Sequence, residues 1–183
     1  MITLYLREHG THNLGYSIDF VANLDNYTDE NDLVEDLFNY TREKFDEEEI
    51  EKYYLENMEE WLITDWELEG NLKLRFNEYA NLQKLIDLNE TLNELDDIEI
   101  KLVSCFIDSG YTEEQAIEKV NSGDVYYFEG RLEDWAEEMV EEGLLGEVDE
   151  KILGYIDYEK VARDLAMDGY TYDYKLNISY STY

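Results

Sequence analysis

Acidic side chains dominate this chain of 183 residues, which contains 47 aspartates and glutamates against 14 lysines and arginines, a formal charge of −33. The excess is spread widely: residues 21–60 carry a net charge of −12, and residues 61–100, 101–140 and 141–183 carry −7, −7 and −6. Repulsion between so many carboxylates opposes a compact fold. The chain nevertheless contains 17 tyrosines, six phenylalanines and three tryptophans, which disordered acidic chains lack. The sequence therefore predicts a folded protein whose surface is crowded with carboxylates.

The charge and composition argue against several classes of protein. A nucleic-acid binder needs lysine and arginine to replace phosphate counterions, and a membrane-surface protein needs a basic face, so we expect neither nucleic acid nor a membrane as a direct partner. No stretch approaches the roughly 18 consecutive apolar residues that span a bilayer, and the N-terminus does not resemble a signal peptide. The single cysteine, Cys105, excludes an intrachain disulfide framework and fits a reducing cytoplasm.

The amount of charge favours an elongated body over a sphere. Duplex DNA carries one charge per roughly 1.7 Å of axis, so 33 excess charges correspond to about 56 Å of duplex. A compact domain of this length would have a radius of gyration of only about 16 Å. We therefore expect an elongated chain of small units. An acidic scaffold or cation-binding protein from a salt-adapted host remains an alternative, and such a protein would unfold at low salt.

The hydropathy pattern predicts an α+β fold of three small units: an N-terminal α+β domain, a central helical domain and a C-terminal α+β domain. Their expected limits are residues 1–70, 71–123 and 124–183. In the first domain, alternation and turn residues predict strands at 2–6, 16–21 and 61–68, a turn at 10–15, and a helix at 32–40. Asp29 or Asn31 could cap this helix, and residues 45–59 fit either a helix or a charged loop.

Helical spacing of apolar residues dominates the central domain. We expect one helix from Leu74 to about residue 88, a second from Leu95 or Ile98 to Ser109, and a third that begins with a capping box at Thr112. In the C-terminal domain, the expected elements are a strand at 125–128, helices at 131–142 and 158–167, a short turn or helix at 152–155, and a final strand or hairpin at 170–183.

Residues typical of catalysis are few. His9 and His12 are the only histidines, and no third metal ligand accompanies them. Cys105 lies on the apolar face of an expected helix, in an acidic protein that does not favour a thiolate, so we expect a core residue. The acidic runs 29–32 and 46–51 lack the pattern of a calcium-binding loop. We therefore expect no cofactor, no metal and no enzymatic activity.

Two motifs stand in the C-terminal third of the chain. Residues 132–148 read LEDWAEEMVEEGLLGEV, and residues 153–165 read LGYIDYEKVARDL. Together they resemble the ArdA antirestriction family, and the first overlaps the segment that is called the antirestriction motif in that family. The N-terminal part, with its opening hairpin, acidic helix and TDWEL strand, is a looser match, and the middle helices match in type and order.

The resemblance implies a DNA mimic. Members of this family are elongated, dimerise through the C-terminal domain and bind Type I restriction–modification enzymes in the DNA groove of the methyltransferase core. They are carried by conjugative elements and phages, so we expect action in the cytoplasm of a bacterial host. The mechanism would be competitive occupation of the groove, and charge complementarity would speed the encounter.

Three sets of residues are the candidates for function. The expected acidic target-binding surface comprises Asp36, Glu43, Asp46, Glu47, Glu48, Glu49, Glu51, Glu59, Glu60, Asp87, Glu90, Glu94, Glu113, Glu114 and Glu118. The antirestriction-like motif comprises Glu133, Asp134, Glu137, Glu138, Glu141, Glu142, Gly143, Gly146 and Glu147. The C-terminal family motif comprises Tyr155, Asp157, Tyr158, Arg163 and Asp164.

Other interpretations of these residues remain open. Any single glutamate of the motif fits the solvated side of a helix equally well. Trp135, Tyr155, Tyr158 and Leu165 are expected in the core, with a dimer seam as the alternative for some of them. A DNA mimic could also inhibit another DNA-binding target, such as a CRISPR effector or a nucleoid protein. An enzyme that uses only aspartate and glutamate would require a pocket of carboxylates with perturbed pKa values.

Overall fold

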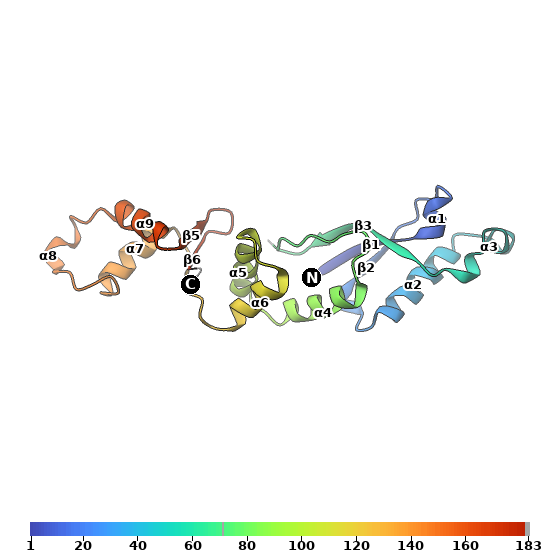
Figure 1. The fold of residues 1–183 in the computed structure, drawn as a ribbon, viewed down its shortest axis with the longest axis horizontal. Coiled ribbons are helices and arrows are strands. Elements are labelled where there is room, and N and C mark those ends of the chain that lie inside the picture. The colour runs from blue at the N-terminus through green and yellow to red at the C-terminus, as the bar shows by residue number, and fades with distance from the viewer. Residues whose placement is uncertain (71, 182–183) are drawn as a thin grey trace. The chain divides into compact units, whose positions relative to one another are not determined.

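The computed structural model describes residues 1–70 and 72–181 and has the α+β fold that the sequence predicts. The chain forms two compact units, Met1–Asp97 and Ile98–Tyr183. Each unit contains a three-stranded antiparallel sheet, and Figure 1 shows the helices that accompany it. The expected division into three domains at residues 70 and 123 stays a prediction.

The sheet of the first unit has β1 (Ile2–Glu8) between β2 (Phe20–Asn23) and β3 (Trp61–Leu68). Every second side chain of β1 is buried, from Ile2 to Glu8, as the alternation predicts. The register places Leu4 opposite Ala22 on one side and Trp66 on the other, with a bulge in the β1–β3 ladder between Tyr5 and Leu6. The expected first hairpin and returning strand are confirmed.

Helices of the first unit follow the caps that the sequence supplies. They are α1 (His9–Asn13), α2 (Glu30–Arg42), α3 (Glu47–Tyr53) and α4 (Leu82–Asn93), with short 3-10 turns η1 (Leu24–Asn26) and η2 (Leu55–Asn57). The Asp29 side chain caps α2 by accepting the amide of Asn31. In the ambiguous stretch 45–59, a capping box between Asp46 and Glu49 starts α3.

Three boundaries differ from expectation. The turn expected at 10–15 begins as the helix α1, because the buried carboxylate of Glu8 accepts the amides of Gly10 and Thr11. The strand expected at 16–21 begins only at Phe20. The residues before it make side-chain contacts instead, since Tyr16 packs edge-on against Phe45 and Tyr53.

The helix expected from Leu74 begins only at Leu82. Leu72 and Leu74 are buried, but they lie in irregular chain. The side chain of Asn81 accepts the amide of Lys84 and so caps α4. These apolar side chains fill the core from a loop, and in the sequence their spacing resembles that of the first turns of a helix.

A polar clamp ties α4 to the sheet of the first unit. The amino group of Met1 lies 2.8 Å and 2.7 Å from the two carboxylate oxygens of Asp25 in η1. The side-chain amides of Asn89 and Asn93 on α4 donate to the same carboxylate, each at 2.8 Å. Asn89 is buried and also accepts the amide of Ile2. These bonds hold α4 in the first unit.

The second unit has a sheet in the order β4 (Tyr127–Phe128), β6 (Ile178–Ser181), β5 (Tyr170–Asp173). Its helices are α5 (Asp97–Asp108), α6 (Glu113–Asn121), α7 (Leu132–Glu141), α8 (Glu150–Leu153) and α9 (Tyr158–Met167). The capping box at Thr112 and the final hairpin are confirmed, although residues 182–183 lie outside the described part of the chain.

The core of this unit lies between α7, α9 and the sheet. Trp135 of α7 is buried, stacks on Phe128 and meets Tyr170 edge-on at 5.1 Å. Leu165 of α9 belongs to the same cluster, so both residues are in the core as predicted. Cys105 of α5 is also buried, as expected. Across the described residues, no helix combines the length and apolarity needed to cross a bilayer.

Candidate target-binding surface

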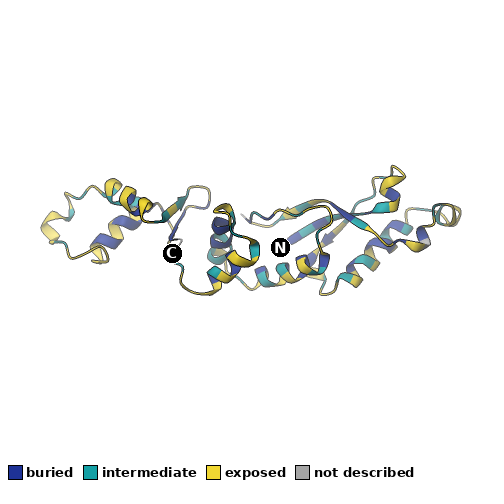
Figure 2. Cartoon of the chain, in the orientation of Figure 1, coloured by how far each residue is buried: buried dark blue, intermediate teal, exposed yellow. Residues whose placement is uncertain are grey.

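The carboxylates of the expected acidic surface lie mostly on the outside of the two units, where Figure 2 shows the exposed positions of each helix. Thirteen of the 15 are exposed, and Glu49 and Glu113 are half-buried. Glu49 has a local role, because its side chain accepts the amide of Asp46 in the capping box of α3. The structure distributes the set over both units.

In the first unit, the densest acidic run forms the start of α3. Glu47, Glu48 and Glu49 occupy the first turn of this helix. Negative charge at a helix N-terminus interacts favourably with the helix dipole, so these carboxylates support the element that carries them. The run that was ambiguous in the sequence is thus folded helix with exposed charge.

Several other carboxylates of this unit have partners other than lysine and arginine. Asp36 accepts the hydroxyl of Tyr27 at 3.0 Å, and burial together with this bond raises the pKa of Tyr27 to about 12. Glu60 lies 2.8 Å from Nδ1 of His9, and Asp87 accepts the side-chain amide of Gln83. These contacts fix side chains without placing a permanent positive charge beside them.

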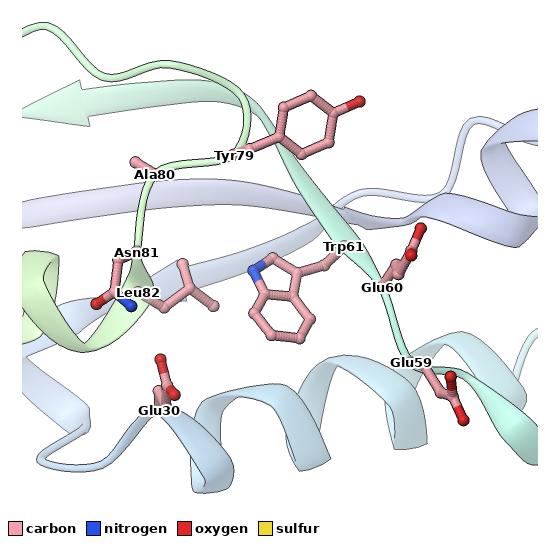
Figure 3. A pocket seen from close by; sticks show the side chains of 8 residues that line it. All are labelled: Glu30, Glu59, Glu60, Trp61, Tyr79, Ala80, Asn81 and Leu82. Atoms are coloured by element: carbon pink, nitrogen blue, oxygen red, sulfur yellow. The ribbon is translucent and has the colours of Figure 1, made fainter.

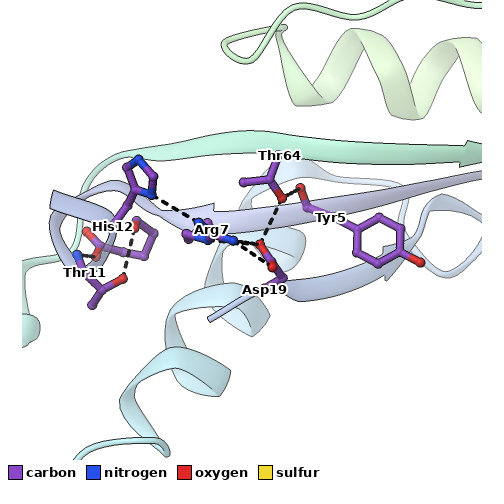
Figure 4. A network of polar contacts seen from close by, with 7 residues as sticks. Tyr5, Arg7, Thr11, His12, Asp19 and Thr64 are labelled. Atoms are coloured by element: carbon purple, nitrogen blue, oxygen red, sulfur yellow. Dashed lines mark hydrogen bonds and ion pairs between the residues drawn. The ribbon is translucent and has the colours of Figure 1, made fainter. Parts of the chain in front are cut away.

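Arg7, one of the few cations of the first unit, lies in a local network of hydrogen bonds (Figure 4). The guanidinium of Arg7 donates to both carboxylate oxygens of Asp19 at 2.8 Å, and Nδ1 of His12 lies 3.2 Å from Arg7. The hydroxyl of Thr64 lies 2.9 Å from Asp19. Burial alone would raise the pKa of Asp19, but the hydrogen bonds from Arg7 and Thr64 hold it below its usual value.

No metal site emerges around the histidines. Within residues 1–70 and 72–181, no group of three histidine, cysteine or acidic side chains is arranged to hold a metal ion. His9 and His12 are instead engaged with Glu60 and Arg7.

In the second unit, the antirestriction-like motif coincides with α7 and the turn that follows it. Leu132, Trp135, Ala136, Met139 and Val140 form the buried face of the helix. The acidic residues form the rest of its surface, so they follow in two rows with i,i+4 spacing. One row contains Glu133, Glu137 and Glu141, and the other contains Asp134, Glu138 and Glu142.

The two halves of these rows differ in their partners. Arg131 lies 2.8 Å from Glu133 and 3.5 Å from Asp134 at the start of α7. The four later glutamates are exposed, and in the described structure no lysine or arginine pairs with them. Glu141 and Glu142 lie at the C-terminus of the helix, where the dipole disfavours negative charge. Their carboxylates therefore lower the stability of α7.

The C-terminal family motif frames the start of α9. Asp157 caps this helix and lies 2.6 Å from the ammonium of Lys160, whose hydrogen bond lowers the pKa of Asp157. The hydroxyl of Tyr158 donates to the carbonyl of Leu153. Burial, and then the charges of Glu137 and Glu141, raise the pKa of Tyr158. Arg163 and Asp164 are exposed on α9.

The turn between α7 and α8 exposes apolar side chains, which sequence reasoning did not predict. Gly143 and Gly146 have φ angles of +75° and +117°, conformations that favour glycine. Leu144 and Leu145 are exposed between them. Tyr155 was expected in the core, and that prediction is wrong, since 88% of it is exposed.

The fold and this surface define an acidic α+β protein. A family model described as antirestriction protein (ArdA) matches residues 19–177. The chain therefore belongs to the ArdA antirestriction protein family, which confirms the resemblance carried by the two C-terminal motifs. A search of curated proteins finds no match. The protein is accordingly an antirestriction protein, a class that acts on restriction enzymes.

Proposed function

We propose that this protein inhibits Type I restriction–modification enzymes as a DNA mimic that occupies the DNA-binding groove of the methyltransferase core. The observation that carries the proposal is the double row of carboxylates on α7, most of which have no cationic partner in the described structure. A groove built for phosphates presents lysine and arginine, which such a surface can meet. Membership of the antirestriction family supports the target class.

The charge density of α7 is close to that of DNA. Six carboxylates lie between Glu133 and Glu142. Nine residue steps at 1.5 Å each span about 14 Å. Counting Arg131 against them leaves about five net charges, or one per roughly 2.7 Å, compared with one per 1.7 Å of duplex axis. A basic groove would therefore meet a local field of the sign and order of magnitude that DNA presents.

The proposed mechanism is stoichiometric occupation without catalysis, and it needs no cofactor. Opposite charges accelerate the encounter and make the affinity fall with ionic strength. We place this action in the cytoplasm of a bacterial host, where restriction enzymes meet incoming DNA.

We also propose that the protein is a homodimer through its C-terminal domain. Leu144, Leu145, Ile152 and Tyr155 are all exposed and lie within 12 residues of one another in the sequence. Apolar side chains grouped in this way are typical of interaction surfaces. Sedimentation of the wild type should give a dimer, and L145D with Y155D should give a monomer. A wild-type monomer at micromolar concentration would exclude this assembly.

A competition assay tests the main proposal. A Type I methyltransferase is mixed with labelled cognate DNA, and the protein is titrated in at low and at high salt. We expect displacement of DNA that is strongest at low salt, while circular dichroism shows that the protein stays folded there. Absence of displacement at low salt would exclude the Type I target. Unfolding at low salt would favour the salt-adapted alternative.

A further inference from the structure

A cavity of about 480 Å³ opens on the first unit between the start of α2, the start of β3 and the loop that leads into α4 (Figure 3). Its lining is Glu30, Glu59, Glu60, Trp61, Tyr79, Ala80, Asn81 and Leu82. The volume is in the range of sites for small organic groups. The lining combines three carboxylates with two large aromatic rings, and no lysine or arginine is among its described residues.

Contacts on both sides of the cavity hold its walls in place. The amide of Glu30 donates to the side chain of Gln83, and the amide of Gln83 donates back to the carboxylate of Glu30, which joins α2 to α4. On the opposite side, His9 lies 2.8 Å from Glu60 and meets the ring of Tyr79 edge-on. The side chain of Glu59 is exposed and has no such partner in the described structure.

The arrangement selects the class of ligand by its chemistry. Three carboxylates disfavour an anion, and a neutral group would gain nothing from their negative charge. The described residues include no group of three ligands arranged for a metal ion, so the carboxylates do not converge on a point. Figure 3 shows the indole of Trp61 between Glu30 on one side and Glu59 and Glu60 on the other. An organic cation that stacks on a ring and reaches a carboxylate at its edge fits this pattern.

Among organic cations, guanidinium fits better than ammonium. It is planar, stacks on aromatic faces and presents a fork of N–H donors that matches a carboxylate, whereas ammonium is compact and strongly hydrated. Tryptophan is also the best aromatic partner for a stacked cation. A guanidinium can therefore stack its face on the indole of Trp61 while its N–H edge donates to a carboxylate of the lining.

We propose that this cavity receives the guanidinium of an arginine from the DNA-binding surface of the target enzyme. This inference rests on the proposed function, because a groove that binds phosphates supplies arginine side chains. One arginine held against Trp61 and Glu59 would give the acidic surface a fixed point of attachment. Diffuse attraction between charges provides no such register.

The site is tested first with a small probe. N-acetyl-arginine amide is titrated into the ¹⁵N-labelled protein, and the indole N–H signal of Trp61, assigned with W61F, is followed by NMR. We expect a saturable shift with the arginine compound and none with N-acetyl-citrulline amide, which has nearly the same shape without the charge. Shifts of equal size with both compounds, or no saturable shift, would overturn the proposal.

Matched variants separate the cavity from general attraction. E59Q removes one carboxylate from the rim, whereas E47Q removes one exposed carboxylate from α3. We expect E59Q, and Y79A at the second aromatic ring of the lining, each to weaken binding of the arginine compound about twofold to fivefold, as loss of an exposed cation contact does. E47Q should change it by less than about twofold. Equal losses of affinity in E59Q and E47Q would show that the effect comes from net charge alone, and would overturn the proposed site.

Two measurements distinguish failure of this site from failure of the proposed function. If the wild type displaces DNA from the methyltransferase but does not bind the arginine compound, the cavity proposal fails and the function stands. If it binds the arginine compound at Trp61 but does not displace DNA, the proposed function fails and the cation site stands. If both measurements succeed, E59Q should displace DNA less effectively than E47Q does.

Discussion

Replacing the four later glutamates of α7 with glutamine, in the variant E137Q/E138Q/E141Q/E142Q, should stabilise the protein and weaken inhibition. Glutamine and glutamate have similar helix propensities, so the exchange changes mainly charge. It removes four like-charge contacts with i,i+4 spacing along the helix. These contacts join Glu133 to Glu137, Asp134 to Glu138, Glu137 to Glu141, and Glu138 to Glu142.

The expected gain follows from the positions of these residues. Four like-charge pairs at about 0.2–0.5 kcal/mol each contribute roughly 1–2 kcal/mol. Removal of two negative charges from the C-terminal turn adds about 0.3–1 kcal/mol for each charge at low salt. Because all four side chains are exposed and screened by solvent, we expect a total gain near the lower end, about 1–3 kcal/mol.

Urea unfolding followed by circular dichroism measures this gain at about 0.01 M and about 1 M salt, where the Debye length is about 30 Å and 3 Å. The gain should be largest at low salt and nearly absent at high salt. E113Q/E114Q is the control of opposite sign, since both residues lie in the first turn of α6 and favour its dipole. A quadruple variant that is no more stable than the wild type at low salt would refute this reasoning.

The same variant connects stability to function. In the DNA competition assay we expect roughly tenfold to a hundredfold weaker inhibition, since four surface charges each contribute up to about 1 kcal/mol. The decrease of affinity with salt should also be less steep. Unchanged inhibition by a stabilised variant would show that α7 does not contact the target.

Three further variants test the fold. D25N should lower the free energy of unfolding by about 1 kcal/mol at pH 7. The amino group of Met1, followed by the two asparagine amides, lowers the pKa of Asp25 to about 2. The expected loss is modest because the side chain of Asp25 is 38% exposed to solvent. A depressed pKa stabilises the fold above the usual value of 3.8, so the difference from wild type in urea unfolding should shrink between pH 4 and pH 2. Y54G should raise the free energy of unfolding by about 1 kcal/mol, because Tyr54 has a φ angle of +57°; an unchanged value would contradict this. G130A should lower the melting temperature, because the added Cβ would lie 2.6 Å from the ring of Phe128. The corresponding loss in the free energy of unfolding is about 1–3 kcal/mol. A melting temperature equal to that of the wild type would show that the ring moves freely.

Helices with a spaced apolar face and a local boundary signal, either a cap or a following glycine, could be predicted from the sequence. Those over residues 113–121, 132–141 and 158–167 lie close to their expected limits, because the signals that bound and bury each one are local. The start of α4 could not be predicted in this way. Leu72 and Leu74 are buried in irregular chain, and only the tertiary contacts of the first unit place α4 against Asp25 and Met1.

The candidate surface was predictable in composition and less so in detail. Acidic residues at exposed helix positions follow from periodicity, and the two motifs identified the family. The cavity around Trp61 could not be found in this way, because Glu30 and Tyr79 lie far from each other in the sequence and come to line one cavity only through the packing of α2, β3 and the loop before α4. The prediction that Tyr155 lies in the core was wrong, because an aromatic residue in an apolar run has the sequence pattern of a core residue.

The local electrostatics divide the carboxylates of this protein into two kinds. The first kind caps helices and comprises Asp29, Asp46 and Asp157. The negative charge of these residues stabilises the fold whether or not a target is bound. Glu141 and Glu142 have the opposite effect, since they lie at a helix C-terminus among like charges. Folding alone gives no reason for charge in such positions, whereas the proposed binding to a basic groove does. Variants at helix caps should therefore impair stability first, and variants late in α7 should impair inhibition while stability rises.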